Sequence, residues 1–269
     1  MGVNEYMDNQ LASLKSQLQE LNLKHLAAKL DNLMLESYSL EKPNSVFLQE
    51  VLQVEVEGRR KASMGKRLRF ANLPVFDKDF DLDLFDFGRR HGVSKRQIME
   101  LASNFVWIDK AFNVLFLGSS GLGKSFLASY LGYKAMESGY NVIFVSMNNL
   151  AQLLKTESIL MRSKARMKRI RNCDLLILDE VGNAVLDRQE ANKVFQLICD
   201  FYQETSIILT SNKGFEEWTQ TLGDAVITTA VLDRLLHKCE IFNLDGESWR
   251  IADQQSILKN LLKAGGQHE

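Results

Sequence analysis

The chain has 269 residues, of which 45% are hydrophobic and 25% charged, enough for one large core and a smaller folded unit. A formal net charge of −1 excludes a globally basic protein, so any nucleic-acid site must be a local patch. There is no apolar signal core near the N-terminus and no apolar run long enough to cross a membrane, so we expect a soluble, cytoplasmic protein without membrane contacts. The spacing of the cysteines favours buried thiols in a reducing compartment over disulfides or zinc ligation. They are Cys173, Cys199 and Cys239.

Two helices are predicted at the N-terminal end of the chain. Leucines that recur at alternating spacings of three and four residues predict one long helix over residues 10–38. A second helix is predicted from Ser45 to about Arg60, since Pro43 and Asn44 precede it. We interpret residues 1–60 as a small all-helical docking or assembly domain, and a coiled-coil dimer arm is the alternative.

A basic stretch separates these helices from the rest of the chain. It begins at Arg59 and continues to Arg69, and Pro74 follows. The change in composition predicts a basic linker over residues 61–75 and a second domain over residues 76–269. The acidic and aromatic segment 76–87 is expected to wrap the edge of that domain, with its aromatic rings packed under the sheet rather than against a base.

A glycine-rich loop is the strongest local motif of the chain. It fits the pattern G-x-x-x-x-G-K-[ST] and consists of Gly118, Ser119, Ser120, Gly121, Leu122, Gly123, Lys124 and Ser125. An apolar run precedes the loop and a helical pattern follows it. Backbone N–H groups of such a loop surround phosphate oxygens, and the helix N-terminus adds partial positive charge. The lysine reaches the β and γ phosphates and the serine hydroxyl ligates Mg²⁺. The loop therefore predicts a site for a nucleoside triphosphate with Mg²⁺.

Strands and helices alternate from residue 113 onward. Apolar, β-branched runs predict five strands, at 113–117, 141–146, 174–179, 206–210 and 239–243. Such runs are typical of a parallel sheet covered by helices on both faces, so the predicted fold class is α/β, with three layers.

Polar residues at strand ends provide the rest of the predicted chemistry. The third strand ends in Asp179 and Glu180, and the fourth is followed by Asn212. Asp179 is expected to hold Mg²⁺ through water, and Glu180 to orient and polarise the attacking water. Asn212 is expected to face the γ phosphate, because the carboxyl ends of neighbouring parallel strands meet at one edge of the sheet.

A strongly basic helix is predicted between the second and third strands. No acidic residue lies between Ser158 and Asn172 to offset its charges, and like charges on one helix repel. We interpret the helix as a surface for nucleic acid or an acidic partner, although a solvated face is the ordinary reading of a charge run. Its basic residues are Arg162, Lys164, Arg166, Lys168, Arg169 and Arg171.

These motifs together resemble the AAA+ ATPases of the initiator clade. Within it, the chain resembles IstB-like transposition helper proteins of bacterial insertion sequences, relatives of DnaC-type helicase loaders. The segments that carry the resemblance are the loop 118–125, the strand end 175–180, Asn212, Asp-Arg-Leu at 233–235 and Glu-Ser-Trp-Arg at 247–250.

The resemblance implies roles for individual residues. Asp179 and Glu180 match the Walker B pair, and Asn212 matches sensor 1. Arg234 matches the arginine finger that reaches the ATP of a neighbouring subunit, and Arg250 matches sensor 2. The basic helix resembles the helical insertion by which this clade grips DNA. Only about 26 residues follow the fifth strand, so a full lid cannot fit, which leaves the position of Arg250 open.

The implied function is an ATP-hydrolysing homo-oligomer that binds double-stranded DNA and recruits and stimulates a transposase. A DnaC-type replicative helicase loader is the alternative with the same ATPase residues. A third reading is a small-molecule kinase, which would act as a monomer without DNA.

Overall fold

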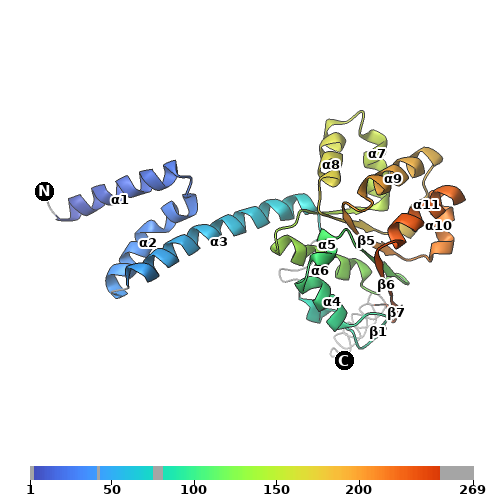
Figure 1. Ribbon diagram of the computed structural model, residues 1–269, viewed down its shortest axis with the longest axis horizontal. Helices are drawn as coiled ribbons and strands as arrows, with labels where there is room; N and C mark the ends of the chain where they lie inside the picture. The colour runs from blue at the N-terminus through green and yellow to red at the C-terminus, as the bar shows by residue number, and fades with distance from the viewer. Residues whose placement is uncertain (1–2, 41–42, 75–80, 249–269) are drawn as a thin grey trace, which may run out of the picture. The chain divides into compact units, whose positions relative to one another are not determined.

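The computed structural model describes residues 3–40, 43–74 and 81–248, and the chain divides into two units, Met1–Lys66 and Arg67–Glu269 (Figure 1). In place of a full lid, the sequence allows one C-terminal helix over residues 248–263, and this segment lies outside the described residues beyond Ser248.

The first unit contains α1 (Val3–Glu20), α2 (Lys24–Leu40) and most of α3 (Asn44–Ala71). The prediction of one helix over residues 10–38 is wrong, because Asn22 adopts a left-handed backbone with φ 58° that ends α1. The amide of Leu23 then donates to the Leu18 carbonyl oxygen at 2.8 Å, as in a helix C-terminal cap. The leucine spacing continues across the break and therefore conceals it.

Helix α3 is longer than the sequence predicts. Its basic stretch, predicted as a linker from residue 61, is helical as far as Ala71, and Pro74 lies three residues beyond. Lysine and arginine are good helix formers, so a cluster of positive charges does not by itself end a helix. Within the first unit, the buried Glu55 carboxylate accepts a bond from the amide of Leu26 at 2.9 Å and thereby caps the N-terminus of α2.

The second unit is built on a five-stranded parallel sheet, as predicted. Its strands are β2 (Asn113–Leu117), β3 (Val142–Ser146), β4 (Leu175–Asp179), β5 (Ser206–Ser211) and β6 (Cys239–Asn243). The spatial order is β3-β4-β5-β2-β6. Strand β2, which leads into the glycine-rich loop, thus lies between β5 and β6. Strand β5 separates β2 from β4, the strand that ends at Asp179.

Helices cover both faces of the sheet, which confirms the three-layer α/β prediction (Figure 1). On one face α6 (Lys124–Glu137) lies close to the strands, because Gly132 leaves room for the Ile177 side chain. Leu176 and Leu178 belong to the core on the opposite face, as the alternation along a strand requires. The helices of that core are α7 (Met147–Thr156), α8 (Met161–Arg171), α9 (Arg188–Phe201), α10 (Trp218–Leu222) and α11 (Ala225–Leu236).

A small second sheet was not predicted. Strand β1 (Arg90–His91) pairs antiparallel with β7 (Asp245–Gly246), which follows β6 closely. This pairing holds the segment before the large sheet against the segment after it.

All three cysteines are free thiols, and burial raises the pKa of Cys173 to about 12. Among the described residues, no helix is long and apolar enough to span a membrane.

Candidate nucleotide-binding site

The glycine-rich loop joins β2 to α6 and ends in a left-handed turn. Gly121 and Gly123 have φ values of 83° and 86°, which side-chain-bearing residues rarely adopt. Gly123 is the N-cap of α6 and offers no side-chain cap, so backbone N–H groups of the first turn point into the loop. A Cβ atom on Gly123 would also lie only 2.7 Å from the Phe85 ring. The loop is therefore shaped for an anion and closely packed from outside.

Lys124 and Ser125 occupy the first turn of α6. The ammonium of Lys124 donates to the carbonyl oxygens of Gly118 and Ser119, both at 2.7 Å. It therefore lies inside the loop, where phosphate oxygens could replace these carbonyls. The hydroxyl of Ser125 donates to Asp179 Oδ1 at 2.7 Å, which brings the loop and the end of β4 together as predicted.

Thr210 is a site residue that sequence reasoning missed. Its buried hydroxyl donates to Asp179 Oδ1 and accepts a bond from the Glu180 amide at 3.0 Å. Glu180 itself adopts a left-handed backbone with φ 57° and ψ 42°, which costs a residue with a side chain about 1 to 3 kcal/mol. One hydroxyl from β5 thus contacts both the carboxylate of Asp179, the predicted metal ligand, and the backbone amide of Glu180, the predicted catalytic residue. The available signal was the position of Thr210 two residues before Asn212.

Asn212 lies on the other side of the same turn. Its amide nitrogen donates to Asn183 Oδ1 at 2.7 Å, and Asn183 ends the short helix η2 (Val181–Asn183) that follows Glu180. Gly182 allows this approach, because a Cβ there would lie 2.6 Å from Asn212 Oδ1. The polar strand end is therefore linked to the segment that follows the Asp-Glu pair.

One cavity of about 400 Å³ unites these groups, and its size is that of an ordinary small-ligand site. Its lining includes most of the predicted loop together with Glu180 and Asn212, and several side chains that were not predicted. The latter are Leu84, Phe85, Arg90, Phe126, Asn183 and Thr210.

Phe85 and Arg90 form an aromatic and cationic wall of the cavity. The guanidinium carbon of Arg90 lies 4.8 Å from the centre of the Phe85 ring, and both side chains are buried. The Phe85 ring also stacks on that of Phe126 at 6.3 Å. The aromatic segment thus supplies a wall of the site, whereas we had expected its rings to pack under the sheet. Residues 76–80 of that segment lie outside the described residues.

The donor set fits Mg²⁺. Magnesium is commonly bound through one or two protein oxygens together with phosphates and waters, rather than by a full protein cage. Ser125 and Asp179 provide a hydroxyl and a carboxylate oxygen 2.7 Å apart at the cavity. Among residues 3–40, 43–74 and 81–248, no cluster of three or more His, Cys, Asp or Glu side chains forms an alternative metal site.

Arg234 is not part of the cavity of its own chain. It lies on α11, donates to the Ala230 carbonyl oxygen at 2.9 Å, and places its guanidinium 5.1 Å from the centre of the Phe195 ring. Arg250 lies outside the described residues.

The basic helix α8 does not present its six charges on one surface. Ser163, Met167 and Ile170 are buried, so the helical repeat sets Arg162, Arg166 and Arg169 on one side of them. On that side Arg166 donates to the carbonyl oxygens of Phe70 and, at 3.1 Å, Phe144, and Arg169 stacks on the Phe70 ring at 4.0 Å. Burial lowers the pKa of Arg166.

The other side of α8 carries Lys164, Lys168 and Arg171. Arg171 makes a two-pronged ion pair with Glu157, which lies just outside the acid-free stretch. This contact lowers the pKa of Glu157 and raises that of Arg171. Three of the six predicted DNA contacts, Arg166, Arg169 and Arg171, are therefore engaged within the fold, while Arg162, Lys164 and Lys168 are exposed.

The sheet order, the glycine-rich loop and the polar residues at the strand ends define a phosphate-loop protein of AAA+ architecture. More specifically, the chain belongs to the family of IstB-like ATP binding proteins, whose model matches residues 16–257. This confirms the resemblance recognised from the motifs.

The chain is similar over most of its length to proteins of bacterial insertion sequences. An "Insertion sequence IS21-like putative ATP-binding protein" from Bacteroides fragilis is 37% identical and aligns over 89% of this chain and 90% of the relative. The "Insertion sequence IS21 putative ATP-binding protein" of Pseudomonas aeruginosa is 36% identical, and 88% of each chain is covered.

Solved structures share the fold at low identity. A crystal structure of DnaI has a TM-score of 0.50 and 16% identity, with 66% of this chain and 94% of that chain covered. A DNA replication initiation factor has a TM-score of 0.50 and 20% identity, with 71% and 56% covered.

Proposed function

We propose that this protein is an ATP-dependent, DNA-binding regulator of transposition, which assembles on target DNA and recruits and stimulates a transposase. The observation that carries the proposal is the near-full-length similarity to ATP-binding proteins of insertion sequences. A cavity lined by the phosphate loop and Glu180, together with the bond from Ser125 to Asp179, supports the ATPase part.

In the proposed reaction the loop amides and the N-terminus of α6 bind the phosphates of ATP. Lys124 exchanges its bonds to the loop carbonyls for bonds to β and γ phosphate oxygens, which are stronger because both partners are charged. Ser125 and Asp179 would hold Mg²⁺, which neutralises phosphate charge when bound.

Glu180 orients a water molecule and accepts its proton as the water oxygen attacks the γ phosphorus. The bond from the γ phosphorus to the bridging oxygen breaks, and ADP and phosphate are the products. Asn212 is assigned to the γ phosphate, because it lines the cavity next to the Glu180 turn.

Arg234 is assigned to the nucleotide of a neighbouring subunit. It serves no group in its own cavity, and a guanidinium is permanently charged and matches phosphate geometry. Hydrolysis would then require a homo-oligomer. Arg250 retains its proposed role as sensor 2 only by the family resemblance.

The DNA surface is assigned to the exposed part of α8. Arg162, Lys164 and Lys168 carry the phosphate contacts, whereas Arg166, Arg169 and Arg171 support the helix. Phosphate contacts position a protein on DNA without reading sequence, so this surface would bind duplexes with little preference.

The decisive experiment is a pull-down in which the purified protein is the bait and a transposase or a replicative helicase is the prey. It is done with ATP, with ATP and duplex DNA, and with neither. We expect duplex DNA to promote an ATP-bound oligomer that retains the transposase of the same insertion element. Capture of a replicative helicase and a preference for single strands would instead favour a helicase loader. Full turnover by a monomer without DNA would favour a small-molecule kinase.

A further inference from the structure

The connection between α7 and α8 exposes apolar side chains at its tip. Ile159 and Met161 are 77% and 80% exposed, and Leu160 between them is the N-cap residue of α8. In Figure 1 this connection lies at the upper edge of the second unit, at the end of the α7–α8 hairpin. Single exposed apolar residues are ordinary on protein surfaces, but neighbouring exposed apolar residues at the tip of a hairpin indicate an interaction site.

The tip is rigidly held. The hydroxyl of Thr156 donates to the Gln152 carbonyl oxygen at 2.7 Å and lies 2.8 Å from the hydroxyl of the buried Ser163. The amides of Ile159 and Leu160 both donate to the Thr156 carbonyl oxygen. The turn is therefore closed by its own bonds, and the exposure of Ile159 and Met161 is a property of a defined conformation.

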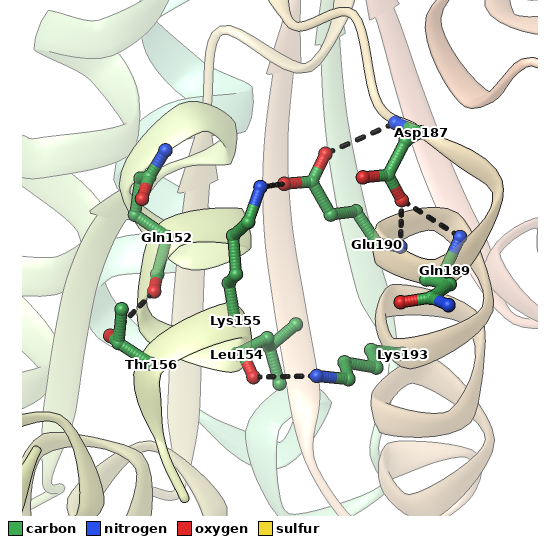
Figure 2. A network of polar contacts seen from close by, with 8 residues as sticks. All are labelled: Gln152, Leu154, Lys155, Thr156, Asp187, Gln189, Glu190 and Lys193. Atoms are coloured by element: carbon green, nitrogen blue, oxygen red, sulfur yellow. Dashed lines mark hydrogen bonds and ion pairs between the residues drawn. The ribbon is translucent and has the colours of Figure 1, made fainter. Parts of the chain in front are cut away.

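Helix α9 contacts the last turn of α7, next to the tip, as Figure 2 shows. The ammonium of Lys193 donates to the Leu154 carbonyl oxygen at 3.1 Å, and Lys155 pairs with Glu190 at 3.2 Å. Glu190 is itself held in the capping box of α9 with Asp187. These contacts fix the hairpin to the core close to its tip, so a side chain at the tip keeps its position when it meets a ligand.

The charge around the tip points to a polyanion. Exposed Arg162, Lys164 and Lys168 follow it along α8, and no acidic residue lies between Ser158 and Asn172. The nearest acid in the sequence, Glu157, is neutralised by Arg171. Lys164 shares a hollow with Glu157 and Asp200, so its charge is partly offset. An apolar tip bordered by predominantly basic side chains matches duplex DNA, which presents phosphates on either side of stacked bases.

We propose that Ile159 and Met161 form an apolar wedge that enters a base step of duplex DNA while the flanking basic residues hold the phosphates. This inference rests on the DNA binding proposed above. Isoleucine and methionine are among the side chains that wedge between base pairs, unstack them and kink the duplex. Pyrimidine–purine steps should be preferred, since they unstack most easily.

The test uses the full chain, ATP and a duplex with 2-aminopurine at a central TA step, whose fluorescence rises when the base unstacks. The duplex ends carry dyes that report bending. The variant Ile159→Ser/Met161→Ser is compared with Val185→Ser/Val226→Ser, since those valines are 84% and 80% exposed elsewhere on the unit. Changes at such exposed positions alter stability by less than about 0.5 kcal/mol, so both variants should fold.

We expect the wild type and the valine control to raise the 2-aminopurine signal and to bend the duplex, and the tip variant to lose both effects. The Kd of the tip variant should change by less than about threefold and its salt slope should be unchanged, because phosphate contacts dominate affinity. DNA binding by the wild type without unstacking or bending would overturn the wedge and leave the proposed function intact. A tip variant that unstacks DNA normally but fails to retain the transposase would also overturn it and assign the tip to a protein partner. Absence of duplex binding by the wild type would overturn both proposals.

Discussion

Replacing Thr210 with valine removes one hydroxyl from the junction of β4 and β5 while preserving side-chain shape. Thr210 is only 1% exposed. Its hydroxyl donates a hydrogen bond to the Asp179 carboxylate and accepts one from the Glu180 amide. Losing a bond to a charged acceptor and leaving a backbone donor without its acceptor should destabilise the second unit by about 2 to 4 kcal/mol. For a unit of this size, the midpoint of thermal unfolding should fall by about 10 °C.

The same change should slow hydrolysis. Glu180 has a left-handed backbone that the Thr210 hydroxyl helps to hold, so without it the carboxylate is no longer fixed toward the attacking water. If the loss of this positioning raises the activation free energy of hydrolysis by about 2 kcal/mol, kcat falls roughly 30-fold. The KM for ATP should change little, because the phosphate loop is untouched.

Thr210→Ser is the matched control. It retains the hydroxyl and loses one methyl group, which costs about 1 kcal/mol. We expect near-normal kcat in steady-state phosphate release and a small shift in thermal unfolding. A valine variant that hydrolyses ATP at the wild-type rate, at a temperature where it is folded, would refute the positioning argument.

Three further predictions follow from the site and the helix hairpin. Lys124→Ala should abolish binding of a fluorescent ATP analogue, whereas Glu180→Gln should bind it normally and release no phosphate; unchanged affinity or turnover would contradict these assignments. Arg234→Ala should be inactive alone but should recover hydrolysis in mixed oligomers with Lys124→Ala, because one variant supplies the loop and the other the finger; no recovery in demonstrably mixed oligomers would rule out action in trans. The pKa of Glu157 is lowered, mainly by its hydrogen bond to Arg171. The ion pair therefore stabilises the fold fully above the pKa of Glu157 in the unfolded chain, about 4.3, and this stabilisation is lost as the pH falls through the lower pKa of the folded state. Glu157→Gln should therefore lower the unfolding temperature at pH 7 more than at pH 3. Because the pair is partly exposed, its loss should change the free energy of unfolding at the two pH values by amounts that differ by less than about 1 kcal/mol. An equal loss at both pH values would exclude an ionic contribution.

The sequence by itself determined the five strands, the phosphate loop and the polar residues that follow β4 and β5. These features depend on local patterns, since apolar runs, glycines with left-handed backbone and a lysine at a helix start specify their own conformation. The family followed from the same motifs.

Only the tertiary structure decided which groups meet. Thr210 is 31 residues from Asp179, and their bond exists because β5 pairs with β4. Phe85 becomes a wall of the cavity because it packs against Gly123, and that approach leaves no periodic signal in the sequence. Arg166 and Arg171 are indistinguishable from Lys164 and Lys168 along α8, yet Phe144 and Glu157 engage the arginines. A charge pattern shows that a helix is basic, but the partners brought by folding decide which charges remain available to a ligand.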